Sequence, residues 1–173
     1  ISYAVADTVS ISFLRSTIDN VVAQGYEDLH PALLRELWIG ILTHRITHRS
    51  VVEKTVPKSL MTLASDTWMA EEATKHPHSL ANDVQATLKE MKISASLGYC
   101  TAEAKVHSDL VCDWEQKKLV LLIVDQTHCF RNAPHHLSGH FLWRERTFLK
   151  LGYGVGRIDA ERWSSLNKPL AKR

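Results

Sequence analysis

The sequence lacks the features that mark several common protein classes. Its three cysteines, Cys100, Cys112 and Cys129, are widely spaced and form no Cys-x-x-Cys pair, which favours a reducing compartment over a secreted disulfide framework. No apolar run approaches the roughly 20 residues that a membrane-spanning helix requires. Neither a Gly-x-Ser-x-Gly nucleophile elbow nor a glycine-rich phosphate-binding loop is present. The sequence therefore gives no direct sign of a serine hydrolase or a nucleotide-binding enzyme.

The composition is that of a folded protein with an uneven distribution of charge. Hydrophobic residues make up 45% and charged residues 23% of the 173 positions, enough for a core without a disulfide or metal. Residues 1–125 hold 12 basic and 16 acidic side chains, whereas residues 126–173 hold nine basic and three acidic ones. A basic C-terminal third favours a polyanionic partner such as RNA, although a solvated basic tail would have the same composition.

The N-terminal half has the apolar spacing of helices. A first helix is predicted over Asp7–Ala23, a second begins at Pro31, and a third runs over Ser59–Thr74. Residues 44–57 have no clear pattern. The His-Pro-His stretch at 76–78 ends the third helix, so we expect a helical region, 1–78, followed by a second domain, 79–173.

The C-terminal half alternates between strand and helix patterns, which indicates an α/β fold with a small mixed sheet flanked by helices. Leu119–Val124 is a continuous apolar run that fits a strand buried on both faces. The other expected elements are a helix over Leu80–Lys92 capped by Ser79, strands over Leu97–Val106 and His107–Trp114, a helix over Gly139–Leu151 capped by Ser138, a strand over Tyr153–Ile158, and a helix capped by Asp159.

An ordered set of residues in this half resembles the RAP domain, an RNA-binding module of organelle proteins. The set begins with the apolar strand that ends in Asp125 and continues with His128 and Phe130. A helix with basic residues and a leucine-rich end follows, and then a strand and a short helix centred on tryptophan. The matching positions are Arg144, Arg146, Phe148, Leu149, Leu151, Gly152, Tyr153, Val155–Ile158 and Trp163–Leu166.

The resemblance implies a restriction-endonuclease-like fold, and part of the module looks like the very-short-patch repair nuclease. Such nucleases hold Mg²⁺ between an Asp on one strand and an acid on the next, with a Lys nearby. Asp109 matches the first acid, but Ile123 stands where the second is expected and no Lys follows it. We therefore expect no catalysis, with Asp109 and Asp125 as vestigial acids. The alternative is a metal-dependent nuclease that acts on organellar RNA through these two residues.

Basic and aromatic residues around the matched segment are the candidate RNA contacts. Trp143 is expected on the surface because charged residues surround it in the sequence. The predicted RNA-binding residues are His128, Arg131, Trp143, Arg144, Arg146, Lys150, Arg157 and Arg162. Further candidates for phosphate contact are Lys168, Lys172 and Arg173, and for base stacking Phe130, Tyr153 and Trp163, although core packing is the preferred role for Trp163.

A zinc site is the other chemistry that this segment suggests. His136 and His140 are four residues apart, a spacing that zinc sites use on a helix. The remaining ligands would be Cys129, His135 and Cys112, whose spacing matches no zinc finger. A polar loop with incidental histidines is the preferred interpretation, so no metal and no cofactor is expected.

Together these observations predict a non-catalytic organellar RNA-binding protein. The resemblance favours a structural component of the mitochondrial ribosome, in the matrix, that binds ribosomal RNA through its basic part and neighbouring ribosomal proteins through its acidic helical part. The alternatives are a mitochondrial RNA processing or stability factor, a plastid location, and a protein-interaction module that has lost RNA contact.

Overall fold

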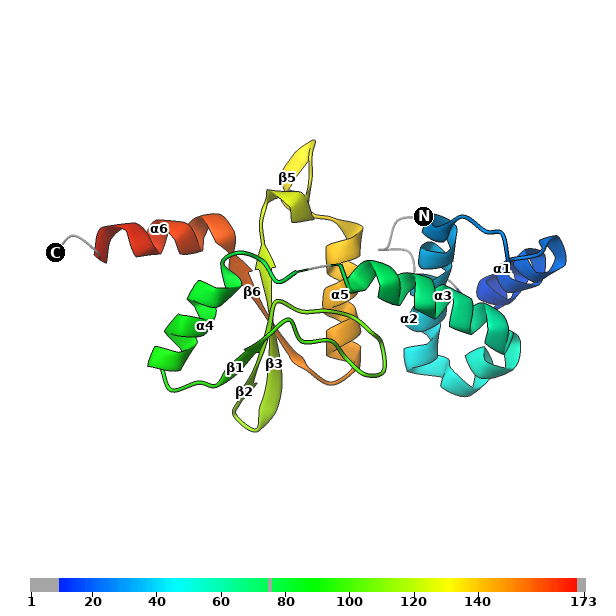
Figure 1. Cartoon of the computed structure of the whole chain (residues 1–173), viewed down its shortest axis with the longest axis horizontal. Coiled ribbons are helices and arrows are strands. Elements are labelled where there is room, and N and C mark those ends of the chain that lie inside the picture. Colours follow the sequence, from blue (N-terminus) through cyan, green and yellow to red (C-terminus); the bar gives the residue numbers. More distant parts are fainter. Residues whose placement is uncertain (1–9, 75, 171–173) are drawn as a thin grey trace. The chain divides into compact units, whose positions relative to one another are not determined.

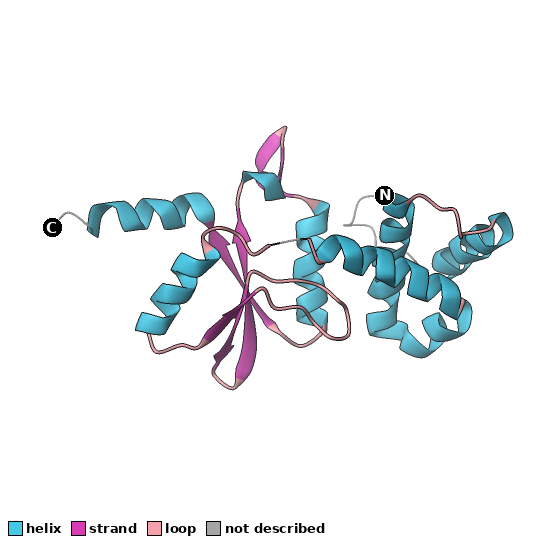
Figure 2. Cartoon of the chain, in the orientation of Figure 1, coloured by secondary structure: helices cyan, strands magenta, loops and turns pink. Residues whose placement is uncertain are grey.

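The chain folds as two compact units that meet at residues 75 and 76. The computed structural model describes residues 10–74 and 76–170, without the side chains at 134, 135 and 167–170. The first unit is helical and the second combines helices with β-sheet (Figures 1 and 2). The observed division lies three residues before the one expected from the sequence. Among the described helices, none is both long and apolar enough to cross a membrane.

Unit 1 contains α1 (Ile11–Gln24), α2 (Pro31–Thr55) and α3 (Lys58–Glu72). The side chain of Ser10 accepts a hydrogen bond from the Phe13 backbone and so caps α1. The stretch without a clear pattern, 44–57, is largely the second half of α2, which is kinked at His48. The first three residues of the helix expected from Asp7 lie outside the described residues. Buried apolar side chains, Trp38 and Trp68 among them, form the core.

Unit 2 has the mixed α/β architecture that the sequence predicts. Its main sheet has the strand order β1-β2-β3-β6, in which β1, β2 and β3 are antiparallel and β6 runs parallel to β3. The elements are α4 (Ala81–Glu90), β1 (Ala95–Leu97), β2 (Leu110–Trp114), β3 (Lys117–Val124), the short 3₁₀ helix η1 (Gln126–His128), β4 (Cys129–Phe130), β5 (Ala133–Leu137), α5 (Gly139–Lys150), β6 (Gly154–Asp159) and α6 (Ala160–Leu170).

Helices cover both faces of this sheet. Side chains alternate along a strand, so Leu121 and Ile123 of β3 lie on one face, where they pack in a cluster with Val84 of α4. On the other face, α5 is tied to β6 by an ion pair between Glu145 and Arg157. Figure 1 shows α4 and α5 on opposite sides of the sheet. The expected burial of β3 is confirmed, since residues 120–123 are all buried.

The glycines of β6 let the leucines of β3 lie across it. A Cβ atom on Gly156 would come 2.8 Å from Cδ2 of Leu121, and one on Gly154 would come 3.1 Å from Cδ1 of Leu119. Such distances are below ordinary contact, so side chains at these positions would force the leucines to move. The alternating glycines therefore serve close packing within the sheet.

The segment after β1 differs from the sequence expectation. The strand expected over Leu97–Val106 ends at Leu97, because Gly98 has a left-handed backbone (φ 61°) and a turn follows in which the Thr101 hydroxyl accepts from the Val106 backbone. Only one isolated bridge, between Cys100 and His107, continues the pairing. The next strand accordingly begins at Leu110 rather than at His107.

Candidate functional site

The two acids of the sequence analysis lie at the same end of the sheet. Asp109 immediately precedes β2 and Asp125 immediately follows β3. The two strands are antiparallel with Leu110 opposite Leu121, so the start of β2 lies beside the end of β3. The fold thus brings together two carboxylates that are 16 positions apart, and we call them the acid pair.

Asp109 is fully engaged within the protein. One carboxylate oxygen accepts a hydrogen bond from the His78 backbone N–H at 3.0 Å, and the other accepts from the Ile123 backbone N–H at 2.9 Å. Nη2 of Arg144 lies 3.5 Å from the second oxygen. The residue is only 9% exposed. Asp109 therefore fastens three segments together, as a buried carboxylate with two backbone donors and a counter-charge does.

Asp125 accepts hydrogen bonds from three residues. One oxygen accepts from the backbone N–H of Thr127 at 2.8 Å, from the Thr127 hydroxyl, and from Nδ1 of His128 at 2.9 Å. The other lies 3.1 Å from Nε2 of His78. Burial alone would raise the pKa of Asp125, but the Thr127 hydrogen bonds, with the two histidines, lower it to about 2. The carboxylate is therefore ionised near neutral pH.

His78 joins the two acids. Its Nδ1 accepts from the Leu80 backbone N–H at 3.1 Å, so its proton is on Nε2, which donates to Asp125. Its own backbone N–H donates to Asp109. Sequence reasoning treated this residue only as part of a helix break. The available signal was a histidine a few residues before a helix start, a position where its ring can accept from the backbone N–H of Leu80, the residue that precedes α4.

His128 lies on η1 with its ring against Phe141 of α5, the ring centroids 5.2 Å apart. Its Nδ1 is 2.9 Å from the Asp125 carboxylate and 3.4 Å from the Asp125 backbone nitrogen, so the shorter contact assigns a proton to Nδ1 that is donated to the carboxylate. Burial lowers the pKa of His128 and outweighs the attraction of Asp125, while the positive charge of Arg144 lowers it further.

The acid pair is poorly arranged to bind a metal ion. Every carboxylate oxygen of Asp109 and Asp125 already accepts a hydrogen bond, and Ile123, which stands where a nuclease has its second acid, is buried in the core. Within the part of the chain that the structure describes, no three His, Cys, Asp or Glu side chains are placed to hold a metal. Mg²⁺ needs several oxygen ligands open to it, so the geometry fits a structural network better than a catalytic centre.

The structure does not assemble the zinc alternative either. Cys112 packs in the hydrophobic cluster under α4, and the Cys129 thiol lies 3.7 Å from the backbone oxygen of Asp125. His136 is exposed on β5, and the side chain of His135 lies outside the described residues.

The expected surface position of Trp143 is wrong. Trp143 is only 3% exposed and is part of the core face of α5, together with Thr147 one turn later. Its charged sequence neighbours point to other faces of the helix, because successive residues on a helix are about 100° apart. Charged neighbours in sequence therefore do not by themselves make a helix residue exposed.

The other predicted contacts divide by exposure. Arg144 is half-buried, with its guanidinium beside Asp109 and 5.5 Å from the centroid of the Phe141 ring. Arg157 is exposed and forms two hydrogen bonds with Glu145. His128 and Arg146 are half-buried, and Arg131, Lys150 and Arg162 are exposed. Lys172 and Arg173, and the side chain of Lys168, lie outside the described residues.

The stacking candidates divide in the same way. Phe130 is 49% exposed. Tyr153 is half-buried, with its hydroxyl 2.8 Å from that of Tyr99, and Trp163 packs on the α4 side of the sheet, where its Nε1 donates to Asp83. Phe130 is thus the exposed aromatic ring of the predicted set.

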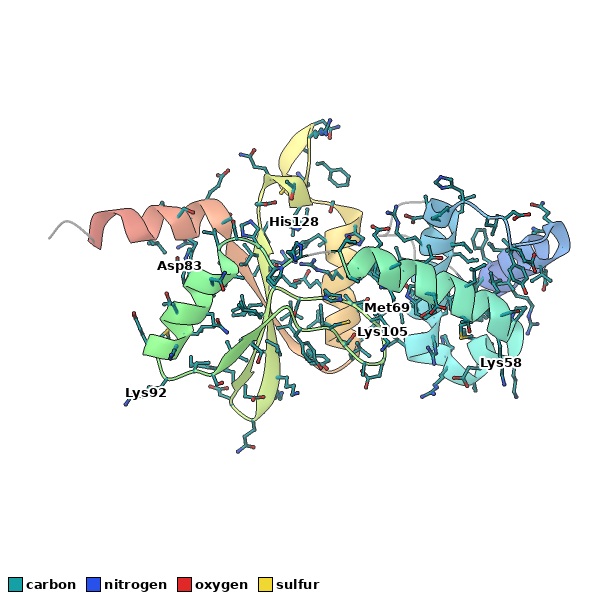
Figure 3. All side chains as sticks on the ribbon, in the orientation of Figure 1. Lys58, Met69, Asp83, Lys92, Lys105 and His128 are labelled. Carbon is teal, nitrogen blue, oxygen red and sulfur yellow. The ribbon has the colours of Figure 1, made fainter. Side chains whose placement is uncertain are left out.

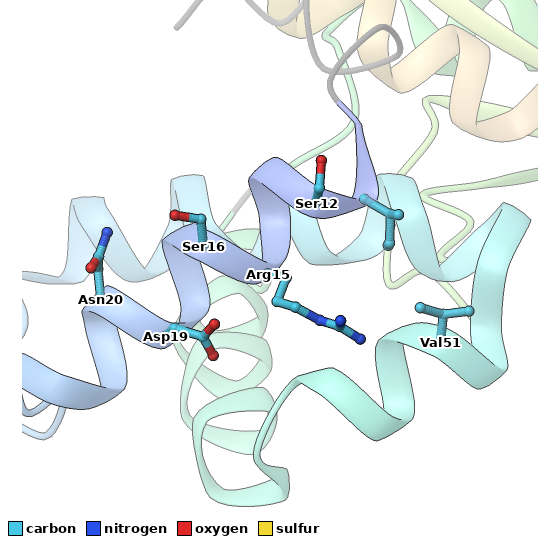
Figure 4. Close-up of a pocket in the computed structure, with 7 residues that line it drawn as sticks. Ser12, Arg15, Ser16, Asp19, Asn20 and Val51 are labelled. Atoms are coloured by element: carbon cyan, nitrogen blue, oxygen red, sulfur yellow. The ribbon is translucent and has the colours of Figure 1, made fainter.

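A separate depression of about 340 Å³ lies in unit 1 between α1 and α2. Figure 4 shows its lining, which includes Arg15, Asp19 and Val51. The lining mixes both charges with apolar groups and contains no buried polar side chain, so nothing there defines a ligand.

The chain matches no family model, and a search of curated proteins finds no significant match.

Proposed function

We propose that unit 2 is a non-catalytic RNA-binding domain of the RAP type. The carrying observation is its exposed positive charge: Arg131 and Arg162 are exposed, in a segment, residues 126–173, where basic residues outnumber acidic ones by nine to three. Arg and Lys contacts to phosphate supply most of the affinity in non-specific RNA binding. The engagement of the acid pair supports binding without cleavage.

The order of helices and strands in unit 2 supports the proposal that its fold is restriction-endonuclease-like. Apart from η1 and the β4–β5 hairpin, which lie between β3 and α5, unit 2 runs helix, three antiparallel strands, helix, parallel strand, helix, which is compatible with a restriction-endonuclease-like domain. The proposal includes an organellar setting, with the mitochondrial ribosome and its RNA as the preferred partner. A metal-dependent nuclease that uses Asp109 and Asp125 is disfavoured, because the oxygens of both are occupied.

The test is a salt titration of RNA binding by the full chain. Fluorescence anisotropy with a labelled, structured RNA should show affinity falling steeply with KCl, with a log–log slope of about −0.7 to −0.9 per phosphate contact. Replacing both Arg131 and Arg162 by Ala should weaken binding and reduce the slope by about 1 to 2. Arg49→Ala is the control, since this side chain of unit 1 is 73% exposed and its loss should change neither quantity.

Salt-independent binding, or an unchanged slope in the double variant, would contradict the proposal. Treatment of the native complex with ribonuclease separates it from the protein-interaction alternative, because an RNA-held chain is released and a protein-held chain is retained. Cleavage of RNA that depends on Mg²⁺ and disappears in Asp125→Asn would show that the nuclease alternative is right.

A further inference from the structure

A small hairpin, formed by β4 and β5, projects from the end of the sheet that carries the acid pair (Figure 1). Its turn, Arg131 and Asn132, is exposed, and the adjacent Phe130 is 49% exposed. An exposed aromatic ring on its own is common, but here it lies on a projecting element next to an exposed arginine, and a ring offers a flat face on which a planar ligand can stack.

The base of the hairpin is held firmly. The Ser138 backbone N–H donates to the His128 carbonyl at 2.7 Å, and Cys129 is paired with Leu137. His128 in turn is bound to Asp125, and Figure 3 shows it at the foot of the hairpin. The network around Asp125 therefore holds the base of the hairpin in place. Because the base is already ordered, the protein loses little conformational entropy there when a ligand binds at Phe130.

The sequence of the hairpin and its flanks favours an anion. Residues 126–144 contain two arginines and four histidines and no acidic residue. Of the two arginines, Arg131 is exposed, whereas Arg144 is paired with Asp109. Phe130 and Arg131 are consecutive and both exposed, so this end of the hairpin offers one ring for stacking and one guanidinium for phosphate binding. Nucleotides combine a planar base with a phosphate. Stacking covers the faces of paired bases inside a helix, so bases in an unpaired loop are the ones that can turn a face to the ring.

We propose that the β4–β5 hairpin binds unpaired nucleotides of RNA, with Phe130 stacked on a base and Arg131 against the neighbouring phosphate. The inference rests on the proposed RNA-binding function and specifies which form of RNA the domain selects. It assigns to the acid pair a positioning role, because Asp125 holds the base of the hairpin and does not itself reach the RNA.

The test compares two RNAs that share one stem: a stem-loop with a uridine loop and the same stem as a blunt duplex. The full chain should bind the stem-loop more tightly. Phe130→Ala should weaken stem-loop binding by roughly 5- to 100-fold, the effect of losing one stacked base, and leave duplex binding unchanged. The unchanged duplex binding shows that Phe130→Ala folds. Phe130→Trp should retain the preference, because an aromatic ring is what the stacking requires.

The matched control is Phe13→Ala in α1 of unit 1, where the ring is 52% exposed. It should leave binding of both RNAs unchanged. A loop preference that survives in Phe130→Ala, or equal binding of both RNAs by the wild-type chain, would overturn the hairpin proposal while RNA binding itself stands. Binding of neither RNA would overturn the proposed function and this inference together.

Discussion

Replacement of Asp109 by alanine tests whether the acid pair is structural. The substitution removes the acceptor of two backbone N–H groups, those of His78 and Ile123, and the counter-charge of Arg144. A buried donor left without an acceptor costs about 1–3 kcal/mol, and breaking a buried ion pair costs about 3–5 kcal/mol. These contributions overlap because water can enter the vacated space, so we expect the free energy of unfolding to fall by about 3–5 kcal/mol.

Thermal and urea unfolding followed by circular dichroism would measure this loss. A domain of about 100 residues loses 4–8 °C in Tm for each kcal/mol, so the transition of unit 2 should fall by roughly 12 °C or more. Asp113→Ala is the control, because Asp113 lies on β2, the strand directly after Asp109 in the chain, with an exposed side chain and should change stability by less than about 0.5 kcal/mol.

The outcome separates two roles of the acid. If Asp109 were kept for metal binding, its removal would relieve repulsion between the two carboxylates and leave the transition unchanged or raise it. An unchanged or raised transition in Asp109→Ala would therefore refute the structural assignment. Asp109→Asn should fall between wild type and alanine, since the amide keeps one acceptor but turns a donor toward another donor.

The remaining predictions concern the dependence of stability on pH and on packing. Because the pKa of Asp125 is lowered from 3.8 to about 2, its contribution to stability is complete above about pH 4 and is lost as the pH falls toward 2. The lowered pKa of His128 means that stability also declines as the pH falls below its ordinary value of 6.5, and urea unfolding should show this decline reduced in His128→Gln. Gly156→Ala should destabilise the chain by about 1–3 kcal/mol, because the new Cβ would collide with Leu121. Gly40→Ala should stabilise it by about 0.5–1 kcal/mol, because a Cβ there meets nothing within 4 Å. Urea unfolding measures both, and a Gly156→Ala variant as stable as the wild type would contradict the packing argument.

The helices and the buried strand could be predicted because their signals are local. The apolar stripe that includes Leu14 and Ile18 gives α1, and Ser138 caps α5 as expected, with its side chain accepting from the Phe141 backbone. The expected cap at Ser79 is wrong, because the helix begins at Ala81 and the His78 carbonyl accepts the first N–H. The β4–β5 hairpin could not be predicted, since its strands are too short to show alternation and its base is held by contacts to η1.

The sequence predicted the two acids of the candidate site but not the hydrogen bonds that they accept. That Asp109 and Asp125 lie near each other follows from the strand order, and the sequence analysis allowed for this. What the acids bind depends on His78, which comes from another segment, and on backbone N–H groups, which have no sequence signature. Burial of Trp143 is likewise a matter of helix rotation that neighbouring residues in sequence do not report.

The position of His78 also defines where unit 2 begins as a domain that recombination can move from one protein to another. A division at the proline break, after residue 78, would assign His78 to the helical unit and remove one donor from each acid. The hairpin base would then lose part of its support. For recombination between proteins, or for comparison among proteins that share this domain, the module starts at His76, and the short stretch before α4 is inherited with the sheet rather than with the helices that precede it.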